Sequence, residues 1–157
     1  TVRCLHAVTG SQLWVFDGHN EAITCLATTP DHVFSGAKDH TVRCLDIRYG
    51  TQLWVFRHTE QVTALAADLK FVYVGDKFGK IALLPARKSD AGTVVRPKHF
   101  IADAHTAAIN ELSVCTHRFT GSYLYSASDR IVLSPLKPID LLGIITYVDV
   151  RDRCVGK

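Results

Sequence analysis

A stretch of sixteen residues recurs forty positions later in this chain. TVRCLHAVTGSQLWVF, residues 1–16, returns as TVRCLDIRYGTQLWVF, residues 41–56, with eleven of sixteen positions identical. A period of about forty residues fits either a four-stranded sheet repeated around an axis or a pair of helices stacked in a solenoid. The residue pattern inside the period must therefore decide between strands and helices.

The pattern between the two copies favours strands. Short apolar segments at 22–27, 32–35, 41–47 and 52–57 alternate with turn residues such as Pro30, Asp31 and Gly50. Apolar residues do not recur at the three- and four-residue spacing of an amphipathic helix, and the β-branched and aromatic content suits strands. We therefore expect four short antiparallel strands that form one sheet, which we call a blade.

Two weaker copies of this unit follow along the chain. In the first, we expect strands over 62–67, 71–74 and 80–84, with a turn at 75–79 and an irregular loop near 86–98. In the second, DAHTAAINEL at 103–112 lies over DGHNEAITCL at 17–26, and strands are expected at 123–126 and 131–133, with a turn at 127–130. The apolar stretch 140–150 predicts one further strand at the end.

Composition sets bounds on the class of protein. The hydrophobic content of 47% is enough for a normal core, and the net charge of +3 is spread without a basic run. Nucleic acid is therefore not a favoured partner. No apolar stretch reaches the roughly 18 to 20 residues that span a bilayer, and the N-terminus lacks signal-peptide order. We expect a soluble protein of the cytoplasm or nucleus, without a membrane partner.

The five cysteines form no CxxC pair, and Cys4 and Cys44 occupy the same repeat position. Neither spacing nor number indicates a zinc site or a disulfide framework. We expect Cys4, Cys25, Cys44, Cys115 and Cys154 to be small buried strand residues, and we expect no metal and no cofactor.

The segment GHNEAITCLATTPDHVFSGAKDHTVRCLD, residues 18–46, resembles a blade of the WD-repeat β-propeller family. The resemblance rests on the Gly-His pair at 18–19, the SGAKDHTVR run at 35–43 and the closing Asp46. In that family a histidine, a serine, an aspartate and a tryptophan form a structural hydrogen-bond network. The resemblance assigns the first three roles to His19, Ser35 and Asp39, while Leu45 replaces the tryptophan.

The later copies keep this network in different degrees. The last copy retains His105, Ser126 and Asp129, whereas the middle copy keeps His58 but has Val74 for the serine and Phe78 for the aspartate. A serine, a histidine and an aspartate also make a hydrolase triad. Two occurrences at equivalent repeat positions favour a structural network that ties a loop to a turn. We therefore expect no catalytic residues.

A second resemblance concerns the tryptophans. Cys44, Leu45 and Asp46, followed by Gly50 and Trp54, have the spacing of the tryptophan-docking motif of quinoprotein-type propellers, and Trp14 lies in the same place in the first copy. In that family each tryptophan stacks on the next blade, which locks neighbouring sheets together. The family includes quinone-dependent dehydrogenases, so an oxidoreductase remains an alternative. It would require a carboxylate cluster for calcium, and the sequence shows none.

Both resemblances imply an all-β propeller of four-stranded antiparallel blades, with about three to four blades visible. Thr1 aligns with Thr41, so residues 1–16 are expected to be the third and outer strands of a truncated blade. Residues 17–57, 58–103 and 104–157 are expected to form the following blades. Because propellers close with about four to eight blades, we expect a larger ring, completed by the same chain or by a partner subunit.

The WD-repeat resemblance implies a non-enzymatic scaffold that binds proteins through one face of loops. The sequence places ten residues there: Asn20, Glu21, Lys38, His40, Glu60, Gln61, Lys77, Lys80, Thr106 and Arg130. Their mildly basic character favours acidic or phosphorylated peptides as ligands. Two alternatives stay open, which are the quinone-dependent oxidoreductase and an RNA- or ribosome-associated propeller.

Overall fold

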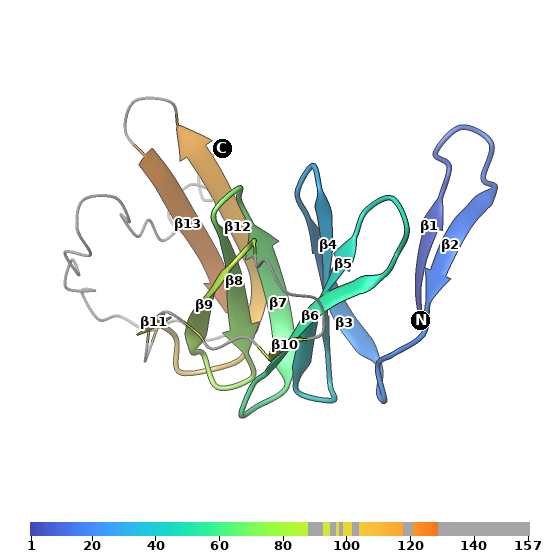
Figure 1. Ribbon diagram of the computed structural model, residues 1–157. Coiled ribbons are helices and arrows are strands. Elements are labelled where there is room, and N and C mark those ends of the chain that lie inside the picture. Colours follow the sequence, from blue (N-terminus) through green and yellow to red (C-terminus); the bar gives the residue numbers. More distant parts are fainter. Residues whose placement is uncertain (88–92, 95–96, 98, 102–103, 118–120, 129–157) are drawn as a thin grey trace, which may run out of the picture.

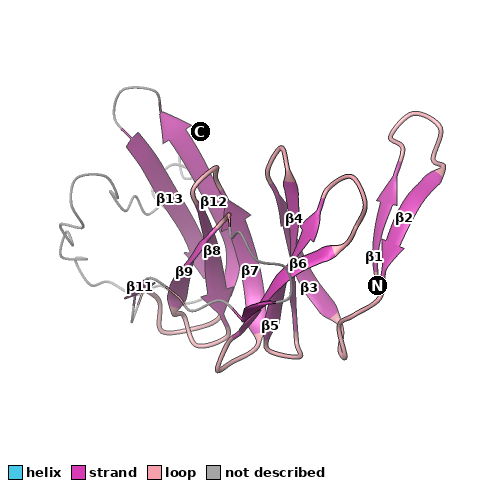
Figure 2. Cartoon of the chain, viewed as in Figure 1, coloured by secondary structure: helices cyan, strands magenta, loops and turns pink. Residues whose placement is uncertain are grey.

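The computed structural model describes residues 1–87, 93–94, 97, 99–101, 104–117 and 121–128 of this protein. All regular structure within these residues is strand, as Figure 2 shows. The described part accordingly holds no helix that could cross a bilayer. The strands are β1 (Val2–Leu5), β2 (Gln12–Phe16), β3 (Ile23–Thr28), β4 (His32–Ala37), β5 (Thr41–Asp46), β6 (Gln52–Arg57), β7 (Val62–Ala67), β8 (Phe71–Asp76), β9 (Ile81–Pro85), β10 (Thr93–Val94), β11 (His99–Ile101), β12 (Ile109–His117) and β13 (Gly121–Ser128).

The strands form four successive sheets that stand side by side (Figure 1). Strands β1 and β2 make a two-stranded sheet, β3 to β6 make the next in chain order, β7, β8, β9 and β11 make a third, and β12 pairs with β13. Each of these neighbouring pairs is antiparallel. The short strand β10 is the exception, because it adds to the outer edge of β6 in a parallel register.

The forty-residue repeat is visible in the register as well as in the sequence. The pairings of β1 with β2 and of β5 with β6 are irregular at the same place, between Cys4 and Leu5 and between Cys44 and Leu45. The pairs β3–β4, β7–β8 and β12–β13 each show an irregularity two residues into their first strand. Equivalent residues thus adopt equivalent pairing in successive sheets.

The hydrophobic core lies between the sheets and not inside any one of them. One cluster joins the β3–β6 sheet to the β7–β9 sheet through Phe34, Trp54 and Phe56 on one side and Val72, Val74 and Leu84 on the other. A second joins the β7–β9 sheet to β12 and β13, and a third joins β1 and β2 to the β3–β6 sheet. Burial of these apolar faces is the main favourable contribution to holding the sheets together.

The strands predicted from the sequence are present, with a few corrections. Strand β4 continues through Ala37, two residues past its predicted end at residue 35, and β8 continues through Asp76, into the predicted turn at 75–79. Strand β13 includes Ala127 and Ser128, which were also expected in a turn. The expected loop at 86–98 contains β10, and β11 supplies a fourth strand to its sheet. The strands expected at 131–133 and 140–150 lie outside the described residues.

The cysteine prediction was correct only in part. Cys44 is fully buried, Cys4 and Cys25 are half-buried, and Cys115 is exposed on the face of β12 that points away from the preceding sheet. Cys115 alternates with Leu112 and Val114, which pack into the second cluster, so strand periodicity turns its side chain outward. Cys154 lies outside the described residues.

Candidate interaction face and the network beneath it

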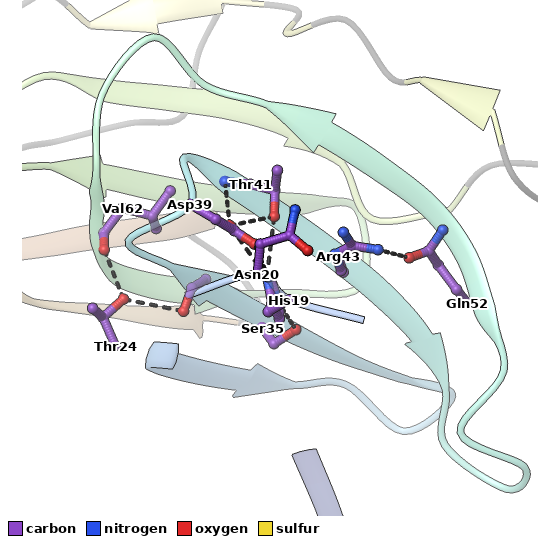
Figure 3. Close-up of polar contacts among 10 residues, drawn as sticks. His19, Asn20, Thr24, Ser35, Asp39, Thr41, Arg43, Gln52 and Val62 are labelled. Carbon is purple, nitrogen blue, oxygen red and sulfur yellow. Dashed lines mark hydrogen bonds and ion pairs between the residues drawn. The ribbon is translucent and has the colours of Figure 1, made fainter. Parts of the chain in front are cut away.

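A hydrogen-bonded network around His19 ties the loop before β3 to the turn after β4 (Figure 3). His19 Nδ1 lies 3.0 Å from Asp39 Oδ2, and His19 Nε2 lies 2.8 Å from Ser35 Oγ. The hydroxyl of Thr41 donates to Asp39 Oδ1 at 2.6 Å, and the N–H of Asn20 donates to Asp39 Oδ2 at 2.9 Å. The structure therefore brings His19, Ser35 and Asp39 together, and it adds Thr41, which the sequence did not single out.

The charges in this network follow from burial and hydrogen bonding. Burial lowers the pKa of His19 below its ordinary 6.5, although the hydrogen bond and the charge of Asp39 oppose that shift. The imidazole is therefore neutral near pH 7, with Nδ1–H donating to Asp39 and Nε2 accepting from the Ser35 hydroxyl. Burial alone would raise the pKa of Asp39, but the hydrogen bonds from Thr41, Asn20 and His19 outweigh it and lower that pKa to about 2. Asp39 is thus a stable anion.

The geometry matches that of a serine hydrolase triad, but the burial does not suit one. Ser35 is 0% exposed and the His19 side chain is only 1% exposed. A nucleophile must reach the substrate carbonyl, and a hydroxyl enclosed between two strands cannot do so. The arrangement is suited to holding a loop and a turn in place.

The next blade builds the corresponding contact from a different residue. His58 occupies the place of His19, and its Nε2 lies 3.9 Å from Asp76 Oδ2, with both side chains buried. Asp76 is the last residue of β8, two positions before Phe78, and its Oδ1 also accepts the N–H groups of Phe78 and Lys80. Burial lowers the pKa of His58, with Asp76 and Glu60 opposing the shift. The sequence comparison missed Asp76 because the carboxylate was expected only at position 78, the repeat equivalent of Asp39.

In the last described blade the histidine and serine also meet. His105 Nε2 lies 2.7 Å from Ser126 Oγ, as His19 does from Ser35. The third predicted member, Asp129, lies outside the described residues.

The loops that precede β3, β7 and β12 share one end of the molecule with the turns after β4 and β8, at the lower edge of Figure 1. Backbone hydrogen bonds link them in sequence. The N–H of His58 donates to the carbonyl of His40 at 2.7 Å, and the N–H of His105 donates to the carbonyl of Gly79 at 3.1 Å. Each turn therefore supports the loop of the following sheet. We call this end the loop face.

Nine of the ten residues predicted for a partner-binding face are described, and they lie in these loops and turns. Asn20, Glu21, Lys38, Lys80 and Thr106 are exposed, whereas His40, Glu60, Gln61 and Lys77 are half-buried. Arg130 lies outside the described residues. Exposure alone does not show that these residues bind a partner, so their role in binding stays a prediction.

Contacts on the loop face separate its charged groups into two kinds. Lys77 Nζ lies 3.2 Å from Glu60 Oε2 and 5.0 Å from the centre of the Phe78 ring, so its charge is partly neutralised. His40 Nδ1 lies 3.0 Å from the carbonyl oxygen of Thr59. Lys38 and Lys80 are exposed and contribute positive charge. Phe78, at 55% exposed, is a large apolar side chain on this otherwise polar face, and the sequence analysis did not include it.

The two tryptophans pack between sheets. Trp54 is fully buried against Phe34, with ring centres 5.8 Å apart. Trp14 reaches across to the turn between β5 and β6, where its Nε1–H donates to the carbonyl of Ile47 at 3.0 Å. A Cβ added to Gly50 would come within 2.6 Å of the Trp14 ring, so the indole lies directly on this glycine.

The described residues contain no group of three or more metal-ligating side chains. Burial raises the pKa of Cys44 to about 12, with the charge of Asp46 acting in the same direction. Burial also raises the pKa of Cys25. Both groups are therefore protonated thiols at neutral pH, which are poor nucleophiles and poor metal ligands.

Residues 10–46 match the protein family described as WD domain, G-beta repeat. No curated protein matches the sequence. Among solved structures, a chain in the crystal structure of the Mitotic Checkpoint Complex is 20% identical with a TM-score of 0.64, and the match covers 78% of this chain and 36% of that one. A humanized mutant of the Chaetomium thermophilum Polycomb Repressive Complex 2 is 15% identical with a TM-score of 0.67, covering 80% of this chain and 30% of the other.

The computationally designed Ika8 protein is 25% identical with a TM-score of 0.53, over 71% of this chain and 46% of that protein. This chain thus spans less than half of the length of each of these three chains. The match at 10–46 confirms the WD-repeat resemblance, and the structural likeness confirms an all-β fold of the propeller type.

Proposed function

We propose that this chain is a non-enzymatic protein-interaction scaffold that binds peptides or subunits of a larger assembly through its loop face. The WD-repeat match supports a role of this general kind. The observation that carries the proposal is the backbone linkage of the loops, in which His40 and Gly79 each bind the loop of the following sheet. A surface held in this way is preorganised, so less entropy is lost when a partner binds.

Acidic or phosphorylated peptides are the ligands we favour. Lys38 and Lys80 are exposed, and in neither turn does a carboxylate lie within ion-pair distance of their amines, whereas Lys77 is paired with Glu60. An exposed ammonium binds a carboxylate or a phosphate most strongly when no protein carboxylate already neutralises it. The exposed Phe78 ring beside Lys77 offers apolar contact next to this charge.

Charge reversal on the loop face tests this proposal. The probe is a fluorescent library of acidic and phosphorylated peptides, screened by anisotropy against the full chain. Lys38→Glu combined with Lys80→Glu is expected to weaken the binding of the selected peptides by at least about tenfold, mainly because the new carboxylates repel the acidic peptides. The matched control is Lys70→Glu, an exposed lysine in the turn after β7 at the opposite end of the sheets.

Unchanged affinity in the double variant, or equal weakening by Lys70→Glu, would rule out this face as the binding site. An oligonucleotide of the same net charge serves as a further control. If it competes for the peptide site with equal affinity and a steep salt dependence, the RNA-associated alternative is favoured.

A further inference from the structure

The outer edge of β6 holds a strand that comes from the following sheet. Strand β10 lies in the connection between β9 and β11, and it pairs with β6 in parallel. Thr93 stands opposite Trp54, and Val94 stands opposite Val55. The connection thus leaves its own sheet and adds a strand to the preceding one. Because an added strand is held by main-chain hydrogen bonds, the edge of β6 is shown to accept an extended segment.

Strand β2 has the same sequence as β6 but carries no added strand. Residues 12–16 and 52–56 both read QLWVF, and each strand pairs on its inner side with a strand that contains VRCL. The two pairings share their register and their irregularity after the cysteine. Within the described residues, β2 pairs with β1 alone. The outer edge of β2 therefore offers the main-chain pattern that β10 uses on β6.

This difference between the two edges follows from the connection in the next sheet. Strand β10 reaches β6 because the connection at 86–98 is long. The equivalent connection beside β2 is the turn at 47–51, in which the N–H of Gly50 donates to the carbonyl of Asp46 at 2.9 Å. A turn closed in this way is too short to add a strand to β2. Strands equivalent to β3 and β4 would join the sheet at β1, as β4 pairs with β5, so they would not cover this edge.

We infer that the outer edge of β2 binds an extended segment of a partner protein, which adds to the sheet as a strand parallel to β2. The pairing of β10 sets the register, so two partner residues stand opposite Trp14 and Val15. The partner segment has β-branched residues at these two positions, like Thr93 and Val94, and no proline there. A free strand edge favours such pairing because its N–H and C=O groups are open to a new strand. The site is separate from the loop face, so the inference does not depend on the proposed function.

Hydrogen exchange of the full chain, measured by mass spectrometry, tests this inference. The probe is a synthetic peptide with the sequence of residues 90–98, blocked at both ends. At saturation it is expected to slow the fastest-exchanging amides of residues 12–16 by at least about threefold. Residues 52–56 are the matched internal control, because they have the same sequence but β10 already pairs with their edge. Their exchange is expected to stay unchanged.

Two sets of variants test whether the main chain makes the contact. Alternate residues of a strand pair with a given neighbour, so N-methylation of the peptide at position 93 or at position 94 is expected to abolish the protection in one case only. In the protein, Thr93→Pro combined with Val94→Pro removes both N–H groups of β10. This variant is expected to free the edge of β6, so that the peptide also slows exchange at residues 52–56.

The control for the peptide is a scrambled sequence of the same composition, which is expected to give no protection. Absence of protection at residues 12–16 up to about 1 mM peptide would overturn the inference. Equal protection by the scrambled peptide, or equal loss from both N-methylated peptides, would also overturn it. The measurement on the unchanged chain decides the question even if the double proline variant fails to fold.

Discussion

At the scale of single residues, Asp39 carries most of the polar network. Its carboxylate accepts hydrogen bonds from two backbone N–H groups, the Thr41 hydroxyl and the His19 ring. The donors belong to the loop before β3 and to Thr41, the first residue of β5. Loss of the carboxylate would therefore leave several donors without an acceptor.

Replacement of Asp39 by alanine is expected to lower the free energy of unfolding by about 2–4 kcal/mol. Urea unfolding followed by circular dichroism measures this change. Asp31→Ala is the matched control, because Asp31 pairs with Arg87 at 2.7 Å but both side chains are more than half exposed. Its cost is expected to stay below about 1 kcal/mol. Similar costs for the two variants would contradict the role given to Asp39.

The two buried histidines make stability depend on pH. Burial lowers the pKa of both His19 and His58 below 6.5, so the unfolded chain binds more protons than the folded chain in acid. The stability that the two neutral histidines contribute is complete above pH 6.5 and is lost as the pH falls through their folded pKa values. The free energy of unfolding then decreases by at most about 1.4 kcal/mol per pH unit for each histidine. The urea concentration at the unfolding midpoint is expected to decrease when the pH is lowered from 7.5 to 5.5. An unchanged midpoint would show that the histidines titrate normally in the folded chain.

The sequence predicted residue types better than it predicted partners. The histidines and serines of the network could be found because the repeat keeps them in place. Asp76 could not be found by that comparison, because a carboxylate two positions away can reach the same imidazole when the strand ends differently. The role of Thr41 also depends on side-chain direction, which periodicity does not specify.

At the scale of elements, the repeated turns give a matched pair of glycines. Gly10 and Gly50 have nearly equal positive φ angles, so an alanine costs about 1 kcal/mol of backbone strain at either position. Only at Gly50 would the new methyl group also overlap the Trp14 ring. We expect Gly50→Ala to destabilise the chain by about 1–3 kcal/mol more than Gly10→Ala, measured by urea unfolding. Equal effects would show that the indole moves away at little cost.

Strands β3 to β6 were predicted within two residues at each end, because alternating apolar residues and turn residues mark them. Strand β10 was not predicted, since two residues provide no periodicity and its pairing with β6 joins positions about forty apart. The lengths of β4 and β8 were underestimated because both strands continue into the small or polar residues that usually mark turns.

At the scale of the whole molecule, each sheet depends on its neighbours, because the hydrophobic clusters lie between sheets. Gly79 is a point where two sheets meet closely. It has a φ of 84°, its carbonyl accepts the N–H of His105, and a Cβ there would overlap the carbonyl group of His105. A change at this turn should therefore affect the following sheet.

Gly79→Ala is expected to cost about 3 kcal/mol or more, from positive φ together with overlap against backbone. Hydrogen exchange measured by mass spectrometry should show that the substitution increases the exchange rate more in β12 and β13 than in β3 to β6. Gly10→Ala, which shares the positive φ but meets no neighbour, is the control. Uniform acceleration over all sheets would mean that the turn does not couple one sheet to the next.

In one blade, position 39 both forms part of the turn and supplies the carboxylate that contacts the histidine. In the following blade these two roles belong to different residues, because Asp76 supplies the carboxylate. In the preceding blade the turn residue Asp39 itself binds the histidine. In the following blade Asp76, the last residue of β8, places its carboxylate near His58, so the residue at position 78 does not have to supply one. An exposed phenylalanine can stand there without removing the carboxylate that faces the histidine. A substitution at position 78 would therefore leave the Asp76 carboxylate in place, whereas a substitution at position 39 would remove the carboxylate that binds His19.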